Sequence, residues 1–226
     1  MNTIIATDYP LTSSYIILTN GTQIDFDLSN TPIFKFSTDF GAKSSLTING
    51  QSVVKKTIKE IYFGDSYKDV TSIGNWFLCG CSSLTSIGLS GLSKVTSIGD
   101  DFLAGCKKLT SVDLSQLSNV TSIGDDFLAY CTGLPSIDLS GLSNITSIGS
   151  GFLQNCSILT TLIMGAETPP TLEGYAFYQA DKLSLILVPC ASELAYKSVA
   201  NWKVKASIIK EYPRVLTVGV CQHSNK

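Results

Sequence analysis

The sequence predicts an α/β repeat solenoid, in which short parallel strands and short helical turns form coils that stack on one another. The main observation is a 25-residue phrase that occurs about four times between Val70 and Met164. Apolar residue types return at fixed places in this phrase, namely Ile73, Ile98, Ile123 and Ile148, then Phe77, Phe102, Phe127 and Phe152, then Cys81, Cys106, Cys131 and Cys156. A fixed period of about 20–50 residues is typical of a solenoid, because a single coil cannot bury its own core.

The composition narrows the possible classes of protein. Of 226 residues, 44% are hydrophobic and 15% are charged, which argues against disorder. A net charge of −2 supplies no basic face for nucleic acid. The longest apolar runs are too short to span a membrane.

The first residues, Met1 to Pro10, lack the basic region and the continuous apolar region of a secretory signal. Two expectations follow from this. Either a leader has been removed and the protein is secreted or held at a cell surface, or it is a virion or cytoplasmic protein made without export.

Residues 1–55 differ in kind from the repeats and predict a β-rich N-terminal segment. Residues 15–28 contain Asn20-Gly21, the signal of a type I′ hairpin between two strands. Residues 33–36 and 45–48 predict further short strands, the second followed by Asn49-Gly50. The segment is either a cap on the solenoid or a separate docking module.

Each central coil is expected to contain two strands and one helical turn. In the copy from Leu84 to Lys108, residues 84–89 alternate apolar and small polar residues, as a half-buried strand does. Residues 95–98 predict a second strand. Asp100 is a candidate cap for a short helical turn that places Phe102, Leu103 and Cys106 inside.

Weaker copies extend this solenoid over residues 56–189. The first coil begins near Ile58, and residues 159–164 and 183–188 predict later strands. Residues 190–226 are expected to form a C-terminal helical cap and tail. Between Ser192, a candidate N-cap, and Trp202, the apolar residues follow helical spacing, and Ile208 and Ile209 are expected to extend the cap. Further along, residues 215–220 suit a strand and residues 222–226 suit a loose tail.

Four of the seven cysteines form a structural ladder with one member per coil: Cys81, Cys106, Cys131 and Cys156. Side chains at equivalent positions lie about 4.8 Å apart and point the same way. A disulfide needs converging Cβ vectors and a zinc site needs converging ligands. The ladder is therefore interpreted as reduced core thiols, with no metal and no cofactor, while Cys190 and Cys221 are a candidate pair.

The phrase between Val95 and Val112, Val-Thr-Ser-Ile-Gly-x-x-Phe-Leu-x-x-Cys-x-x-Leu-Thr-Ser-Val, resembles the BspA-type, or Treponema pallidum-type, leucine-rich repeat family. The match covers about Ile58 to Val188, and the Tyr196- and Trp202-bearing segment after Pro189 is similar to the family's usual close. One departure is that the central copies carry Phe-Leu where the family has Ala-Phe, a form kept at Ala176-Phe177. The resemblance implies a leucine-rich-repeat fold and a non-catalytic adhesion or recognition role, because members are mostly bacterial or protozoan surface molecules that bind host proteins or other cells.

The residue inventory argues against an enzyme. The only histidine is His223, close to the end of the chain, so a Ser-His-Asp or Cys-His arrangement has no plausible base. No Gly-rich phosphate loop is present. Asp100, Asp101, Asp125 and Asp126 stack on adjacent coils, and the sequence leaves open whether they bind calcium or are solvated acids at the start of helical turns.

The candidate binding residues lie on one sheet face of the solenoid: Thr85, Ser86, Thr110, Ser111, Asp113, Ser136, Asp138, Thr160 and Thr161. A framework role is an open alternative for this row, because threonine suits a half-exposed strand. The row varies at Asp113, Asp138 and Ile163, where the first copy has Gly88. Further variety lies in the aromatic flank of Tyr175, Phe177 and Tyr178.

These observations favour a binding or adhesion module that recognises a protein or glycan on another cell or surface. The main alternative is a virion structural protein, such as a bacteriophage fibre or a capsid-decorating component. In that case residues 1–55 dock onto a homo-oligomer or larger assembly and the solenoid is displayed. An intracellular scaffold is a third hypothesis.

Overall fold

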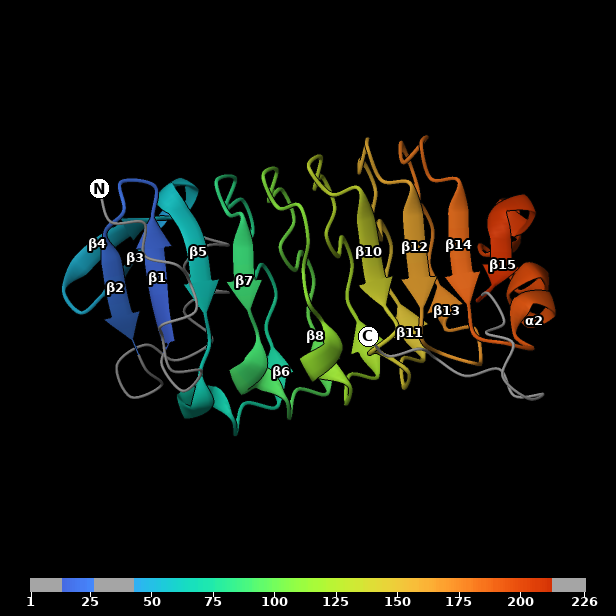
Figure 1. The fold of residues 1–226 in the computed structure, drawn as a ribbon, viewed down its shortest axis with the longest axis horizontal. Coiled ribbons are helices and arrows are strands. Elements are labelled where there is room, and N and C mark those ends of the chain that lie inside the picture. The colour runs from blue at the N-terminus through green and yellow to red at the C-terminus, as the bar shows by residue number, and fades with distance from the viewer. Residues whose placement is uncertain (1–13, 27–42, 213–226) are drawn as a thin grey trace.

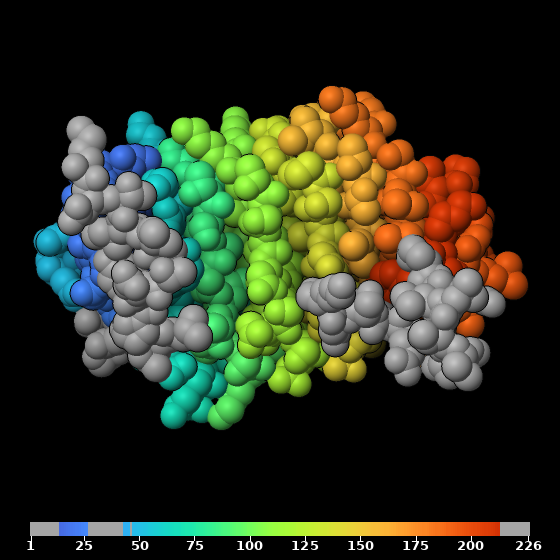
Figure 2. Space-filling model, viewed as in Figure 1, coloured from blue at the N-terminus to red at the C-terminus, as the bar shows by residue number. Residues whose placement is uncertain are grey.

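The computed structural model describes residues 14–26 and 43–212. The chain winds into coils that stack along the long axis of the molecule (Figure 1), with β1 and β2 near one end and β15 and α2 at the other. The space-filling view shows the coils as successive bands of colour along this axis (Figure 2). This is the repeat solenoid that the 25-residue period predicts, and no helix in the described ranges has the length and apolarity to cross a membrane.

One side of the stack is built from the longer strands, which we call the front row. Its members are β5 (Ile58–Tyr62), β7 (Ser86–Gly88), β10 (Ser136–Leu139), β12 (Thr161–Met164), β14 (Leu185–Val188) and β15 (Ile209–Glu211). β5 pairs with β7, and β10, β12, β14 and β15 pair in that order, all in parallel. Parallel pairing of successive coils brings equivalent residues side by side.

The opposite side of the stack is a five-stranded parallel sheet of very short strands, which we call the back sheet. Its members are β6 (Ser72–Ile73), β8 (Ser97–Ile98), β9 (Ser122–Ile123), β11 (Ser147–Ile148) and β13 (Thr171–Leu172). The isoleucines pair across neighbouring coils and point into the core, where they are at most 3% exposed. The isoleucine repeat of the sequence is therefore one wall of the core.

The hairpin predicted around Asn20-Gly21 is confirmed, but its turn is not of type I′, because Gly21 has a positive φ angle and Asn20 does not. β1 (Ser14–Leu18) pairs antiparallel with β2 (Gln23–Phe26), and β1 also pairs antiparallel with β5 of the first coil. A second hairpin joins β3 (Ser45–Ile48) to β4 (Gln51–Val54) through Asn49 and Gly50, whose φ angles of 48° and 75° suit a type I′ turn. The strand expected at 33–36 lies outside the described residues, and the division at residue 55 stays a prediction.

The centre of the coils is filled by a column of phenylalanine rings. Phe77, Phe102, Phe127 and Phe152 are all 0% exposed. Successive ring centroids lie 5.5, 5.2 and 5.8 Å apart, with interplanar angles of 23° or less. Offset stacking at such distances adds to the gain from burying the rings, so this column is a main source of contact between coils.

The cysteine ladder runs through the same core. Cys81, Cys106, Cys131 and Cys156 are free thiols that are 0% exposed. The last three each donate a hydrogen bond from Sγ to a leucine carbonyl of the preceding coil, at 3.5, 3.3 and 3.2 Å. Burial raises the pKa of all four thiols, that of Cys156 to about 11, so they stay protonated at neutral pH.

The helical turn expected after Asp100 is wrong, although Phe102, Leu103 and Cys106 are buried there. The segment forms consecutive turns, with positive φ angles at Asp101 (56°), Leu103 (55°) and Gly105 (74°). These turns let backbone amides bond to neighbouring coils: Asp101 N–H donates to Asp125 O at 2.7 Å, and Leu103 N–H donates to Phe77 O at 2.9 Å.

The short helical pieces lie elsewhere in the coils. They are 3₁₀ turns named η1 (Lys55–Thr57), η2 (Asp65–Tyr67), η3 (Ser90–Leu92) and η4 (Ser115–Leu117). η3 and η4 follow the front-row segments of their coils and bury Leu92 and Leu117.

The front row has no strand at residues 109–114, where the repeat predicts one. Thr85 and Thr160 begin their front-row segments by donating their amides to Lys59 O and Pro135 O of the preceding coil, both at 2.8 Å. Pro135 occupies this position in the coil after Thr110 and has no N–H to donate. The ladder between those two coils therefore lacks this hydrogen bond.

The C-terminal segment contains a shorter helix than the sequence predicts. α2 spans Glu193–Ser198 and is followed by the 3₁₀ helix η5 (Lys203–Ile208). Ser192 is the N-cap residue of α2, as the sequence predicts, and its carbonyl accepts the first helical hydrogen bond, from Tyr196 N–H at 3.0 Å; its side chain makes no capping hydrogen bond. Ile208 ends η5, and Ile209 begins β15, which pairs with β14 at the end of the front row.

Two aromatic side chains tie this segment to the last coils. Tyr196 donates its hydroxyl to Ala166 O at 2.8 Å, and Trp202 donates Nε1–H to Pro170 O at 2.9 Å. Both side chains are 0% exposed. The strand expected at 215–220, the tail at 222–226 and the partner Cys221 proposed for Cys190 lie outside the described residues.

Candidate functional site

The candidate site is the outward surface of the front row, which we call the front face. Burial alternates along β7, β10, β12 and β14, so every second side chain points away from the core. The outward positions carry Glu60, Tyr62, Ser86, Gly88, Ser136, Asp138, Thr161, Ile163, Leu185, Leu187 and Lys210, with Ser111 and Asp113 exposed in the segment that lacks a strand. Parallel pairing brings these residues together across the coils.

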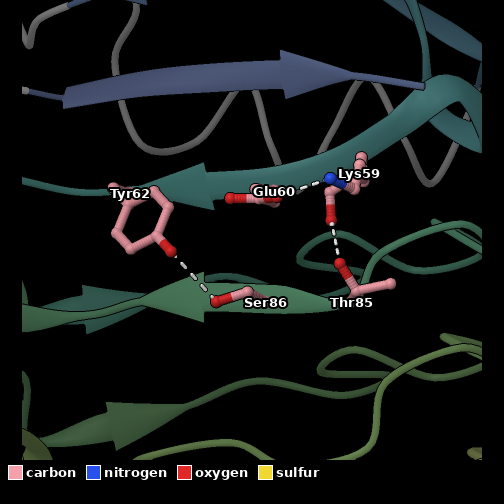
Figure 3. Close-up of polar contacts among 5 residues, drawn as sticks. All are labelled: Lys59, Glu60, Tyr62, Thr85 and Ser86. Atoms are coloured by element: carbon pink, nitrogen blue, oxygen red, sulfur yellow. Dashed lines mark hydrogen bonds and ion pairs between the residues drawn. The ribbon is translucent and has the colours of Figure 1, made fainter. Parts of the chain in front are cut away.

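The N-terminal third of the front face is an ordered polar network (Figure 3). Tyr62 on β5 reaches across to β7, where its hydroxyl lies 3.1 Å from Ser86 Oγ. Its ring stacks on Tyr15 of β1 at 4.7 Å and covers Gly88, where a Cβ atom would lie only 2.4 Å from the ring. Glu60 forms an ion pair with Lys59 at 2.9 Å. This third is therefore held by contacts within the protein.

The middle third is acidic and open to solvent. Asp113 and Asp138 are both exposed. Each uses one carboxylate oxygen to accept the backbone amide two residues later, from Ser115 at 2.9 Å and Ser140 at 2.7 Å. Burial and the charge of Asp138 raise the pKa of Tyr212 to about 12. The two carboxylates present negative charge in the centre of the face.

The C-terminal third is mainly aliphatic and ends at the exposed Lys210 of β15, which pairs with Leu187. Ile163 on β12 pairs with Leu187 on β14, and Thr161 pairs with Leu185. Ile163, Leu185 and Leu187 are all only partly buried although they point away from the core. The front face thus changes along the stack from an aromatic network, through carboxylates, to an aliphatic surface.

The threonines of the predicted site point along the stack. Thr85 donates its hydroxyl to Lys59 O at 3.1 Å, and Thr160 donates to Pro135 O at 3.1 Å. On the other side of the coils, Thr96, Thr121, Thr146 and Thr171 each donate in the same way to the preceding coil. These contacts favour the framework role that the sequence left open for Thr85 and Thr160. The predicted residues that face outward from a strand are Ser86, Ser136, Asp138 and Thr161. Thr110, Ser111 and Asp113 lie in the segment that forms no strand.

The four aspartates on adjacent coils also form contacts between coils. Asp100 Oδ1 accepts from Asp125 N–H at 2.9 Å, and Asp125 Oδ1 accepts from Ser150 N–H at 2.7 Å. Asp126 accepts a hydrogen bond from Gln154. Burial, and next the charge of Asp126, raise the pKa of Asp101. In the described part of the chain, no three His, Cys, Asp or Glu side chains are grouped so that they could hold a metal ion.

Several members of the front face carry no clear signal in the sequence. The flanking coils, whose sequences have diverged from the central repeat, contain four of them: Glu60, Tyr62, Leu185 and Leu187. Aligning those coils by their inward residues, Ile61 with Ile87 and Leu162 with Ile186, would have identified them. His223 lies outside the described residues.

Comparisons with known proteins assign the chain to a family and give its structural neighbours. The family model for the BspA type leucine rich repeat region matches residues 47–189, in 6 copies. No curated protein sequence matches the chain.

Three solved structures are similar to this one. The Treponema pallidum leucine rich repeat protein is 19% identical with a TM-score of 0.48, and the match covers 57% of each chain. A leucine-rich repeat protein from Bacteroides ovatus is 15% identical with a TM-score of 0.28, over 91% of this chain and 76% of that one. A leucine rich cell surface protein from Faecalibacterium prausnitzii is 14% identical with a TM-score of 0.25, over 81% and 72%.

The chain therefore spans little more than half of the T. pallidum protein. The family match agrees in position with the coils, since it runs from β3 to the residue after β14. Because that match extends over more than half of the sequence, this protein belongs to the BspA type leucine-rich repeat family.

Proposed function

We propose that the protein is a non-catalytic recognition module whose front face binds a ligand on another cell or surface. The observation that carries this proposal is the contrast between the two kinds of position in each coil. Inward residues and the threonine rows repeat from coil to coil and serve the stack. The second outward position of the front row instead varies along the stack, from Tyr62 and Gly88 through Asp113 and Asp138 to Ile163 and Leu187. Packing between coils does not fix the residue type at these outward positions, so variation there is suited to recognition of a ligand.

A protein surface fits the front face better than a glycan does. Asp113 and Asp138 lie beside the aliphatic surface of Ile163, Leu185 and Leu187. A ligand that carries basic side chains next to an apolar patch would meet both. A glycan remains the alternative for this face. We propose that the protein acts at a cell surface or after secretion.

The front face is tested by charge reversal and by placing a charge in its apolar part. We expect Asp138→Lys or Ile163→Asp to weaken binding by about tenfold or more, because the first reverses the central charge and the second desolvates a carboxylate against the ligand. Binding is measured as capture of purified extracellular-matrix proteins, and of intact animal and bacterial cells, by the immobilised chain.

The matched control is Asp181→Lys, which makes the same change of charge at an exposed position outside the front face. This variant should bind as the original chain does. Equal capture by the Asp138→Lys chain, or no capture of any panel member by the original chain, would contradict the proposal.

If the protein is instead a virion component, residues 1–55 would have to bind the chain to a larger assembly. Removing them is a poor test, because Ile16 and Phe26 of this segment pack into the same core as Ile61 and Phe63. The intact chain should instead be sized by light scattering over a range of concentrations. Self-assembly predicts a mass that rises above 24.2 kDa, and a constant monomer mass would count against assembly between copies of this chain.

A further inference from the structure

A second surface of interest lies at the C-terminal end of the stack, away from the front face. A cleft of about 290 Å³ opens between the turn that follows β13 and the segment around η5. Its walls include Glu173, Tyr175, Tyr178, Asn201, Val204 and Lys205. The volume lies near the lower end of the range for small-molecule sites.

Two tyrosine rings form one wall of this cleft. Tyr175 is 75% exposed and Tyr178 is 52% exposed. Their ring centroids lie 6.2 Å apart and their planes are nearly perpendicular, at 87°. The rings therefore hold each other in an edge-to-face arrangement while most of their surface stays available.

The coil does not need these rings for its own packing. Hydrogen bonds between coils align the segments, since Gly151 N–H donates to Gly174 O and Asn155 N–H donates to Tyr178 O. In this alignment Tyr175 corresponds to Asp126 and Gly151, and Tyr178 corresponds to Ala129 and Gln154. The same turn thus forms with small or polar side chains at both positions.

Tyr175 also has an unfavourable backbone conformation. Its φ angle is 58°, in the left-handed region that favours glycine, asparagine and aspartate. A large aromatic residue there gains no burial in return, because it is the most exposed of the tyrosines described. The equivalent position of the first coil carries Trp76, also at positive φ and 46% exposed, so the cleft is distinguished by its paired rings and not by the backbone conformation.

The polar groups of the cleft indicate the chemistry of its ligand. Asn201 donates Nδ2–H to Leu172 O, which fixes its amide and leaves Oδ1 as an acceptor. Glu173 and Lys205 carry opposite charges on the same cleft, so it has no net charge. The Lys205 ammonium lies 5.9 Å from the centre of the Phe177 ring, and exposed Val204 adds an apolar wall. A ligand of large net charge would meet a like charge on either Glu173 or Lys205.

We propose that this cleft is a binding site for a neutral sugar in pyranose form. Such a ring presents a face of C–H groups, which can lie on Tyr175 or Tyr178, and hydroxyls at its edge, which can bond to Asn201, Glu173 and Lys205. A protein segment fits less well, because a stable protein interface needs about 800 Å² on each partner and this cleft accommodates only one or two rings. The proposal does not depend on the function of the front face.

The variants for the test come from the chain's own repeats. Tyr178→Ala places in this coil the residue that Ala129 supplies two coils earlier, and Tyr175→Asn places a neutral residue that tolerates positive φ. Both should therefore fold. The matched control is Tyr130→Ala, which removes another exposed tyrosine, at 48%, that does not line the cleft.

The probes are neutral oligosaccharides of glucose, galactose, mannose and N-acetylglucosamine, beside acidic oligosaccharides that carry uronic or sialic acid. Binding is measured by saturation-transfer NMR and titration calorimetry. At least one neutral sugar is expected to bind, and Tyr175→Asn and Tyr178→Ala should each weaken it by about tenfold or more, while Tyr130→Ala leaves it unchanged.

Three results would overturn the proposal. One is the absence of binding by every neutral sugar at millimolar concentration. Another is unchanged affinity in the Tyr178→Ala chain, and the third is binding of acidic sugars alone. None of these results bears on the front face, whose test uses different residues and different probes.

Discussion

Replacement of Phe127 by alanine is expected to lower the free energy of unfolding by about 3–5 kcal/mol. Phe127 is 0% exposed, and its ring lies between those of Phe102 and Phe152, at 5.2 and 5.8 Å. The substitution removes two stacking contacts and leaves a cavity in the middle of the column. Because each coil contacts only its neighbours, no other part of the core can compensate.

Urea denaturation followed by circular dichroism measures this effect. Phe127→Leu is the first control and should cost less, because leucine keeps most of the buried volume. Tyr130→Ala is the second control, because this side chain is exposed in the same coil and should change stability by less than about 0.5 kcal/mol. A loss below about 1 kcal/mol for Phe127→Ala would mean that the column does not hold the coils together.

The same column shows how much of the fold the sequence could predict. A period of 25 residues with apolar residues at fixed places requires the equivalent residues to stack, whatever the local backbone does. The isoleucine wall, the phenylalanine column and the hairpin at Asn20-Gly21 were predictable for this reason. Each depends on spacing or on a single turn motif.

The backbone after Asp100 was not predictable from the same pattern. Phe102, Leu103 and Cys106 can lie on one side of a helical turn or of consecutive turns with positive φ, so their spacing fits both. The choice is made by hydrogen bonds to the coils before and after, from Leu103 N–H to Phe77 O and from Asp101 N–H to Asp125 O. Contacts between residues about 25 positions apart leave no local signature.

The candidate site was predictable in part for a related reason. Rows of threonine and serine are visible in the sequence, but a row does not tell whether its side chains point outward or toward the next coil. Thr160 donates to the preceding coil and Thr161 lies at an outward position, although the two are neighbours. The diverged coils hid Tyr62 and Leu187, because the repeat could be recognised there only by its inward residues.

Replacement of Gly124 by alanine is the second change with a large expected effect, a loss of about 2–3 kcal/mol in the free energy of unfolding. A Cβ atom at Gly124 would lie 2.6 Å from both the Asp100 amide nitrogen and the Gly99 carbonyl carbon of the preceding coil. Backbone atoms cannot move aside as a flexible side chain can. The coils would have to separate, which would stretch the hydrogen bond from Asp125 N–H to Asp100 Oδ1.

Gly105→Asn is the matched control for this change. Gly105 has a φ angle of 74°, which asparagine tolerates, and the nearest atom to an added Cβ is 3.7 Å away. The next two coils already carry Tyr130 and Asn155 at the equivalent position with positive φ, so the variant should lose less than about 1 kcal/mol by the same urea titration. If Gly124→Ala proved as stable as Gly105→Asn, the close approach at Gly124 would not set the spacing of the coils. The spacing would then follow from the phenylalanine column alone, since rings stacked at 5.2–5.8 Å require no glycine beside them.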